Sequence, residues 1–306
     1  MPPYNVPFLL HPYVSLYSTR GCPAQCTFCL WPQTLSGHAW RKRSTDDVAA
    51  EMAHAKQLFP HVKEFFFDDD TFNIQKARTI ELCEKLAPLG LTWSSTSRVT
   101  TDYDTLKAMK ESGCRLLIVG FESGDPQILK NVKKGATVER ARQFAKDCHS
   151  LGLTIHADFI LGLPGETKES IRNTINFAKS LDCETIQVSI AHAYPGTEFY
   201  DYAKANGFIV NSQAMSDEGG HQMAHIEYPG LPTDYVMEMV HRFYDEYYFR
   251  PKAAFRVVWK AVMNRDVPRL YVEAKAFLKL RAQRNRMVKE SRSHKAEPQT
   301  PIKAGV

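Results

Sequence analysis

The stretch YVSLYSTRGCPAQCTFC, residues 13–29, decides the fold of this 306-residue chain. It begins with a β-rich run at residues 13–19 and continues into a loop that holds Cys22, Cys26 and Cys29. Tyrosine, valine and threonine favour strands. The sequence therefore predicts a strand that ends in a cluster of three thiols.

Beyond this stretch, apolar strands alternate with amphipathic helices as far as residue 205. Such alternation indicates βαβ units and a parallel sheet. Six successive units, with no phosphate-binding fingerprint after the first strand, favour a barrel-like α/β arrangement whose chemistry lies at the C-terminal ends of the strands. The predicted strands are 13–19, 64–67, 91–97, 115–121, 153–161 and 185–190; the predicted helices between and after them are 44–59, 74–87, 103–111, 138–151, 168–181 and 198–205.

The chain length suits one main domain with an appendage. We expect a lead-in at residues 1–12, a barrel at 13–208, a loop or cover at 209–232, a helical basic extension at 233–290 and a disordered tail at 291–306. The extension is predicted to begin with an aromatic-rich helix at 233–248.

Composition and cysteine usage predict a cytoplasmic protein. Hydrophobic residues make up 43% and charged residues 24%, as in ordinary soluble proteins. No apolar run is long enough to span a bilayer, and no secretion signal opens the chain. Seven cysteines form a poor disulfide framework. Four of them stand in apolar patterns, where we expect small core residues: Cys83, Cys114, Cys148 and Cys183.

The spacing Cys22-x3-Cys26-x2-Cys29 suits a metal centre. A short loop of thiolates can wrap an iron–sulfur cubane, and three ligands for four irons leave one iron open to a small molecule. Zinc is the alternative, but a structural zinc site needs four ligands and no second Cys or His pair lies nearby. His38 is a weak candidate for a fourth ligand.

This motif resembles the signature of the radical S-adenosylmethionine (SAM) superfamily, C-x3-C-x-φ-C, with Phe28 in the aromatic place. The resemblance covers roughly residues 10–205. It implies a partial (β/α)6 TIM-like barrel, a 4Fe-4S cluster on Cys22, Cys26 and Cys29, and SAM on the open iron. It further implies reductive cleavage of SAM to a 5′-deoxyadenosyl radical that abstracts hydrogen, with a flavodoxin- or ferredoxin-type electron donor.

Three adjacent carboxylates follow the second predicted strand, at Asp68, Asp69 and Asp70. Such a run is repulsive unless a cation lies near it. It resembles the F-x-D-D-x-F motif of the superfamily branch that includes cobalamin-binding proteins, which implies that Asp69 or Asp70 receives the amino group of SAM. The alternative, helix capping, accounts for one of the three.

Later strand ends supply further cofactor candidates. Arg98 would present a guanidinium suited to a carboxylate. Glu122 lies in a G-x-E-S-G segment and Gly162 in a G-x-P-G-E-T turn, both of which resemble family motifs. The alternatives are a rim salt bridge for Arg98 and Glu122 and a purely structural turn for Gly162. Weaker candidates for substrate contacts are Lys133, Lys134, His192, His221 and His225.

Basic and apolar residues interleave at residues 252–289. Such a segment can lie on an anionic membrane surface or pack on the barrel with a basic outer face. Nucleic-acid binding is disfavoured because no RNA-binding module accompanies it. The whole run resembles the radical SAM proteins of hopanoid biosynthesis. This implies a hopanoid lipid substrate, ring contraction of its amino-sugar head group to a cyclitol ether, and peripheral contact with the inner face of the cytoplasmic membrane.

Other functions stay open at this point. The related branch usually has a cobalamin-binding domain of roughly a hundred residues or more ahead of its cysteines. Only 21 residues precede Cys22, so cobalamin is assigned only if a domain is missing from this sequence. One alternative function is a radical SAM methyltransferase or methylthiotransferase acting on RNA or another substrate. The second is a non-enzymatic iron–sulfur or zinc protein.

Overall fold

A six-stranded parallel sheet forms the centre of the computed structural model, which describes residues 6, 8–210, 224–253, 255, 275 and 282. The strand order β1-β4-β5-β6-β7-β8 follows the chain, as expected for successive βαβ units. This confirms the predicted α/β fold with a partial barrel. The strands are β1 (Tyr13–Leu16), β4 (Glu64–Phe67), β5 (Trp93–Ser97), β6 (Cys114–Glu122), β7 (Thr154–Leu161) and β8 (Thr185–Ile190).

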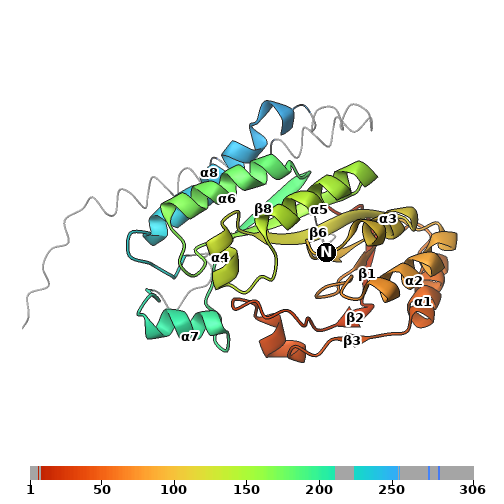
Figure 1. Cartoon of the computed structure of the whole chain (residues 1–306). Helices are drawn as coiled ribbons and strands as arrows, with labels where there is room; N and C mark the ends of the chain where they lie inside the picture. Colours follow the sequence, from red (N-terminus) through yellow and green to blue (C-terminus); the bar gives the residue numbers. More distant parts are fainter. Residues whose placement is uncertain are drawn as a thin grey trace, which may run out of the picture.

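Helices cover one face of this sheet (Figure 1). They are α1 (Thr45–Leu58), α2 (Lys76–Leu86), α3 (Tyr103–Glu111), α5 (Val138–Leu151), α6 (Lys168–Leu181) and α8 (Thr233–Tyr248). Side-chain caps fix several of their starts; the Thr167 hydroxyl, for instance, accepts from the backbone of Ser170. A short helix that the sequence pattern missed, α4 (Pro126–Asn131), follows β6.

The sheet divides its side chains between two environments. On β7, Ile155, Ala157 and Phe159 lie in the apolar core beneath the helices. Because side chains alternate along a strand, His156 and Asp158 face the opposite, concave side. The concave side therefore carries polar residues, which would be unfavourable on the apolar face that the helices cover.

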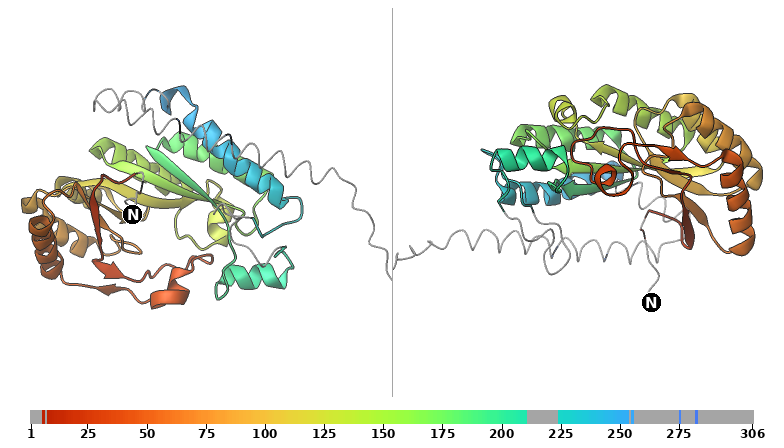
Figure 2. Two further views of the ribbon diagram at one scale, coloured as in Figure 1. Left: turned by 180° about the vertical axis from the view of Figure 1, so that it is seen from behind. Right: turned by 90° about the horizontal axis from the view of Figure 1, so that it is seen from below.

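The cysteine segment lies on the open side of the sheet, beside α7 (Glu198–Ala205), as Figures 1 and 2 both show. The predicted strand 13–19 is interrupted, because β1 ends at Leu16 and Thr19–Arg20 (β2) pairs instead with Arg41–Lys42 (β3) in a small antiparallel ribbon. Between the two halves of this ribbon run the cysteine loop and a π-helical turn, Pro32–Ser36.

Two backbone hydrogen bonds hold the cysteine loop in place. The Thr27 N–H donates to the Val132 carbonyl, N···O 3.1 Å, just after α4. The Phe199 N–H at the start of α7 donates to the Thr27 carbonyl, N···O 3.0 Å. Segments more than a hundred residues apart in sequence thus fix the loop from two sides.

Several predictions fall on residues outside the described ranges. The cover at 209–232 is described only at its ends, where Ile209 pairs with Ile226 and Tyr228 with Leu231. Nearly all of the basic segment 252–289, the whole of the tail 291–306 and His221 lie outside. Among the helices that are described, none has the length and apolar character to cross a bilayer.

Candidate functional site

The three loop cysteines differ from the other four in exposure. Cys22, Cys26 and Cys29 are free and partly exposed, whereas the remaining cysteines are buried in the core, as predicted. Burial raises the pKa of the Cys29 thiol to about 11, against a smaller opposing effect of a hydrogen bond from the backbone of Trp31. Soft thiolate donors on one short loop fit an iron–sulfur cluster. Within the described part of the chain, no three metal-binding side chains have the geometry that holds a metal ion.

Asp69 holds the backbone just before the cysteine loop through hydrogen bonds. Its carboxylate accepts from the Ser18 N–H (2.7 Å), the Ser18 hydroxyl (2.6 Å) and the Thr19 N–H (2.9 Å). The residue is only 1% exposed, and burial raises its pKa although these hydrogen bonds oppose the shift. The geometry gives Asp69 a structural task, and its contact with the amino group of SAM stays a prediction.

Asp70 lies closer to the thiols. One of its carboxylate oxygens accepts from the Gly21 N–H at 2.6 Å, and the residue keeps part of its surface exposed. The hydroxyl of the next residue, Thr71, lies 3.6 Å from the sulfur of Cys22. Of the predicted acidic pair, Asp70 is therefore the better placed to receive a cation beside the cluster.

A buried ion pair stands on the other side of the cysteine loop. The Lys134 ammonium lies 2.6 Å from a carboxylate oxygen of Glu122, and both side chains are about nine-tenths buried. Burial lowers the pKa of Lys134, but the charges of Glu122 and Cys26 and the hydrogen bond to Glu122 together outweigh it, so the net shift is upward. Arg98, predicted to bind a carboxylate, uses one Nη to donate to the Lys134 carbonyl at 2.6 Å. The structure thus brings Arg98 and Glu122 together through Lys134.

The backbone beneath this pair is specialised. Glu122 has a φ of 64°, a left-handed conformation that is costly for a residue with a side chain. A Cβ on Gly120 would come within 2.2 Å of the Glu122 carboxylate and 2.9 Å of the Lys134 ammonium. A side chain at position 120 would therefore force the ion pair to shift from its present geometry.

Asp158 joins this group and was not predicted. It stands beside Gly120 in the β6–β7 register, and its carboxylate lies 3.4 Å from the His156 ring. Burial, together with the charge of Glu122, raises the pKa of Asp158 to about 8. The one carboxylate in the mostly apolar run 153–161 was the signal available in the sequence. With this raised pKa, Asp158 can hold a proton beside the Glu122–Lys134 pair.

Gly162 shapes the turn after β7. Its φ is +90°, its N–H donates to the buried Glu166 carboxylate, and its carbonyl accepts from the Tyr228 hydroxyl at 3.0 Å. With both backbone groups occupied, the observed task of Gly162 is structural, and direct contact with a cofactor stays a prediction. Phe28 packs partly buried against the core beside the thiols.

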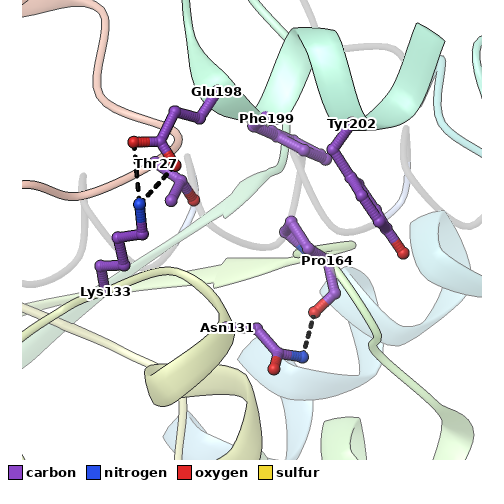
Figure 3. Close-up of a pocket in the computed structure, with 7 residues that line it drawn as sticks. All are labelled: Thr27, Asn131, Lys133, Pro164, Glu198, Phe199 and Tyr202. Atoms are coloured by element: carbon purple, nitrogen blue, oxygen red, sulfur yellow. Dashed lines mark hydrogen bonds and ion pairs between the residues drawn. The ribbon is translucent and has the colours of Figure 1, made fainter. Parts of the chain in front are cut away.

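A pocket of about 340 Å³ adjoins the cysteine loop (Figure 3). Two interactions join residues of its lining: the ion pair between Lys133 and Glu198 at 2.7 Å, and the hydrogen bond from Asn131 to the Pro164 carbonyl at 2.9 Å. The rest of the lining comes from Thr27, Phe199 and Tyr202. The pocket lies where the cysteine loop, α4 and α7 meet.

Two of the weaker candidates for substrate contacts lie together after β8. The rings of His192 and His225 have centroids 3.5 Å apart, and His225 accepts from the Ala193 N–H at 3.1 Å. Burial lowers the pKa of both, that of His225 to about 4, so both imidazoles are neutral at physiological pH.

Comparison with known proteins gives a family and several methylases. The model of the radical SAM superfamily matches residues 16–178, just over half of the chain. An uncharacterized methyltransferase of Pyrococcus horikoshii is 32% identical over 81% of this chain and 54% of its own length. The hopanoid C-3 methylase of Methylococcus capsulatus is 26% identical over 62% of this chain and 36% of its own length. The chain spans about half the length, or less, of these curated relatives.

A solved structure shares the fold. The radical SAM methyltransferase TsrM from Kitasatospora setae, with tryptophan and a SAM analogue bound, has a TM-score of 0.64 and 19% identity. The match covers 76% of this chain and 51% of that one. At this identity the similarity concerns the arrangement of strands and helices.

Proposed function

The chain belongs to the radical SAM superfamily, and from this premise we propose that it is a methyltransferase whose cluster is held by Cys22, Cys26 and Cys29. Membership makes it an enzyme that uses a 4Fe-4S cluster and SAM, which sets aside the non-enzymatic alternative. The observation that carries the proposal is the thiol loop after β1, in a chain 32% identical to a methyltransferase.

The residues around the loop suit this cofactor pair. When bound, the cluster supplies the electron that cleaves SAM reductively. Asp70 offers a partly exposed carboxylate to an ammonium group, and Arg98 keeps guanidinium donors beyond the one given to Lys134. Glu122 is fixed by Lys134, and Phe28 presents an apolar surface beside the thiols. These assignments, with Asp69 and Gly162 as supports, form the proposed cofactor site.

Methyl transfer replaces ring contraction as the main proposal. The relatives named above are all methylases, and none is described as contracting a ring. A hopanoid substrate keeps the support of one relative, the hopanoid C-3 methylase. We therefore propose that the methyl acceptor belongs to a class of molecules that includes polycyclic lipids. We also propose residues 252–289 as the segment that would approach a membrane.

The proposal is tested with anaerobically reconstituted chain. Iron and sulfide are quantified, and SAM with a trideuterated methyl group is supplied with dithionite, with and without cobalamin, in the presence of hopanoid lipids. We expect about four irons per chain, S-adenosylhomocysteine, and deuterated methyl groups in a lipid acceptor. Cys26→Ala should lose the cluster, whereas Cys83→Ala, a substitution of a buried core cysteine, should retain it.

Two outcomes contradict the proposal. If the cluster assembles but SAM is never consumed, the chain is not a working radical SAM enzyme. If 5′-deoxyadenosine forms without any methylated product or S-adenosylhomocysteine across lipid acceptors, methyl transfer is wrong and another radical reaction takes its place.

A further inference from the structure

The exposed face of the cysteine segment is strongly cationic. The first 45 residues contain four basic and no acidic side chains, the first carboxylate being Asp46. Arg43 is neutralised by Asp47 and Glu51. The other three side chains form what we call the cationic ribbon: Arg20, Arg41 and Lys42. Among the described residues, none of these three has a carboxylate within 4 Å, and all three are exposed.

The cationic ribbon contains an unfavourable pair. Arg20 and Arg41 are direct partners in the register of β2 and β3. Like charges placed opposite each other across strands destabilise the pairing. Their direct partners within the described residues are uncharged: Arg20 lies over the Tyr17 ring, and Lys42 lies over the Trp40 ring and donates to the Gln75 amide oxygen at 2.9 Å. An anionic partner would relieve this repulsion.

The position of the ribbon relates it to the thiols. Arg20 precedes Cys22 by two residues, and the strand β3 closes the same segment after the cysteine loop. The segment forms its own layer on the open side of the sheet, away from α6 and α8 (Figures 1 and 2). Trp31, two residues after Cys29, is 57% exposed on it. A protein that delivers electrons to the cluster gains from docking here, because electron transfer slows steeply with distance.

We propose that the cationic ribbon is the docking surface for an acidic one-electron donor protein of the flavodoxin or ferredoxin class. The inference rests on the proposed function, which requires an electron for each reductive cleavage of SAM. The donor is oxidised by one electron and the enzyme's cluster is reduced by one. Complementary charge would steer the acidic donor to the thiol segment and raise the association rate, an effect that salt screens.

The experiment uses the reconstituted full chain and a reduced acidic flavodoxin. The variant R20E/R41E reverses two charges, and K146E, which reverses one charge at a lysine exposed on the outer helix α5, is the control for charge reversal elsewhere on the surface. Flavodoxin binding is measured at low and high salt, and SAM cleavage is measured with flavodoxin or with dithionite as reductant. We expect R20E/R41E to weaken binding and slow flavodoxin-driven cleavage about tenfold or more at low salt, with the dithionite rate unchanged. K146E should alter neither.

Each other outcome is decisive. Unchanged flavodoxin binding in R20E/R41E overturns the proposal, as does an equal loss with both reductants, which would mean that the ribbon only supports the loop. Loss of binding to anionic vesicles or RNA with flavodoxin binding intact would assign the ribbon to those partners instead. If dithionite supports no cleavage even in the unaltered chain, the proposed function fails, while the salt-dependent flavodoxin binding still decides the docking surface.

Discussion

Replacing Lys134 by methionine should destabilise the chain far more than the same change one residue earlier. Lys134→Met keeps most of the apolar stem but leaves the Glu122 carboxylate, 8% exposed at its side chain, without its ammonium partner at 2.6 Å. Breaking a buried ion pair by removing one partner costs about 3–5 kcal/mol. Lys133→Met is the control, because Lys133 and Glu198 are both more than half exposed, and such pairs contribute about 0–1 kcal/mol.

Urea unfolding followed by far-UV circular dichroism gives the required free energies. A double-mutant cycle adds Glu122→Gln, which removes the orphaned charge, so that Glu122→Gln/Lys134→Met should recover about 2 kcal/mol relative to Lys134→Met. Equal losses for Lys134→Met and Lys133→Met would refute the reasoning. So would a double variant no more stable than Lys134→Met, because the cost would then come from packing alone.

Three further substitutions test the surroundings of the loop. Asp158→Asn should raise the free energy of unfolding by about 1–2 kcal/mol at pH 8 and by nearly nothing at pH 4, because the raised pKa of Asp158 penalises folding only where the unfolded side chain is ionised. The side chain is one-third exposed, which keeps the gain below the free energy that the whole pKa shift would give. Urea unfolding between pH 4 and pH 8 measures the gain. Asp69→Ala should cost about 3 kcal/mol because it leaves the Ser18 donors unpaired, whereas exposed Asp68→Ala should cost under about 0.5 kcal/mol in the same urea assay. Arg20→Glu should stabilise the apo chain by a few tenths of a kcal/mol up to about 1 kcal/mol, since it sets opposite charges across from Arg41, and a lower melting temperature would contradict this.

The regular part of the fold was predictable because it rests on local patterns. The longest strands, β6 and β7, consist mostly of apolar residues, and the covering helices repeat their apolar positions at helical spacing. The ribbon of β2 and β3 has two residues per strand, too few for any alternation to appear. The helix α4 has six residues, and it was missed for the same reason.

The site was predictable only where a motif is contiguous. Cys22, Cys26 and Cys29 lie within eight positions, so spacing alone identified them. The partnership of Glu122 with Lys134 depends on a turn after α4, and the place of Asp158 beside them depends on the register with Gly120. Such contacts arise from the packing of β6 against β7. The sequence patterns placed Lys134 among five weaker candidates, because no feature of the neighbouring sequence marks a lysine that will be buried in the fold.

The charged groups on the two sides of the cysteine loop favour different kinds of partner. Inside, Lys134 pairs with Glu122, and the pKa of Asp158 beside them is raised to about 8, which favours retention of a proton. Outside, Arg20 and Arg41 face each other without a carboxylate, which favours an anionic partner. Because buried charges cost far more than exposed ones, the inner group constrains the sequence through stability as well as function. Exposed charges such as those of Arg20 and Arg41 cost little, so it is the repulsion between them that favours an anionic partner there.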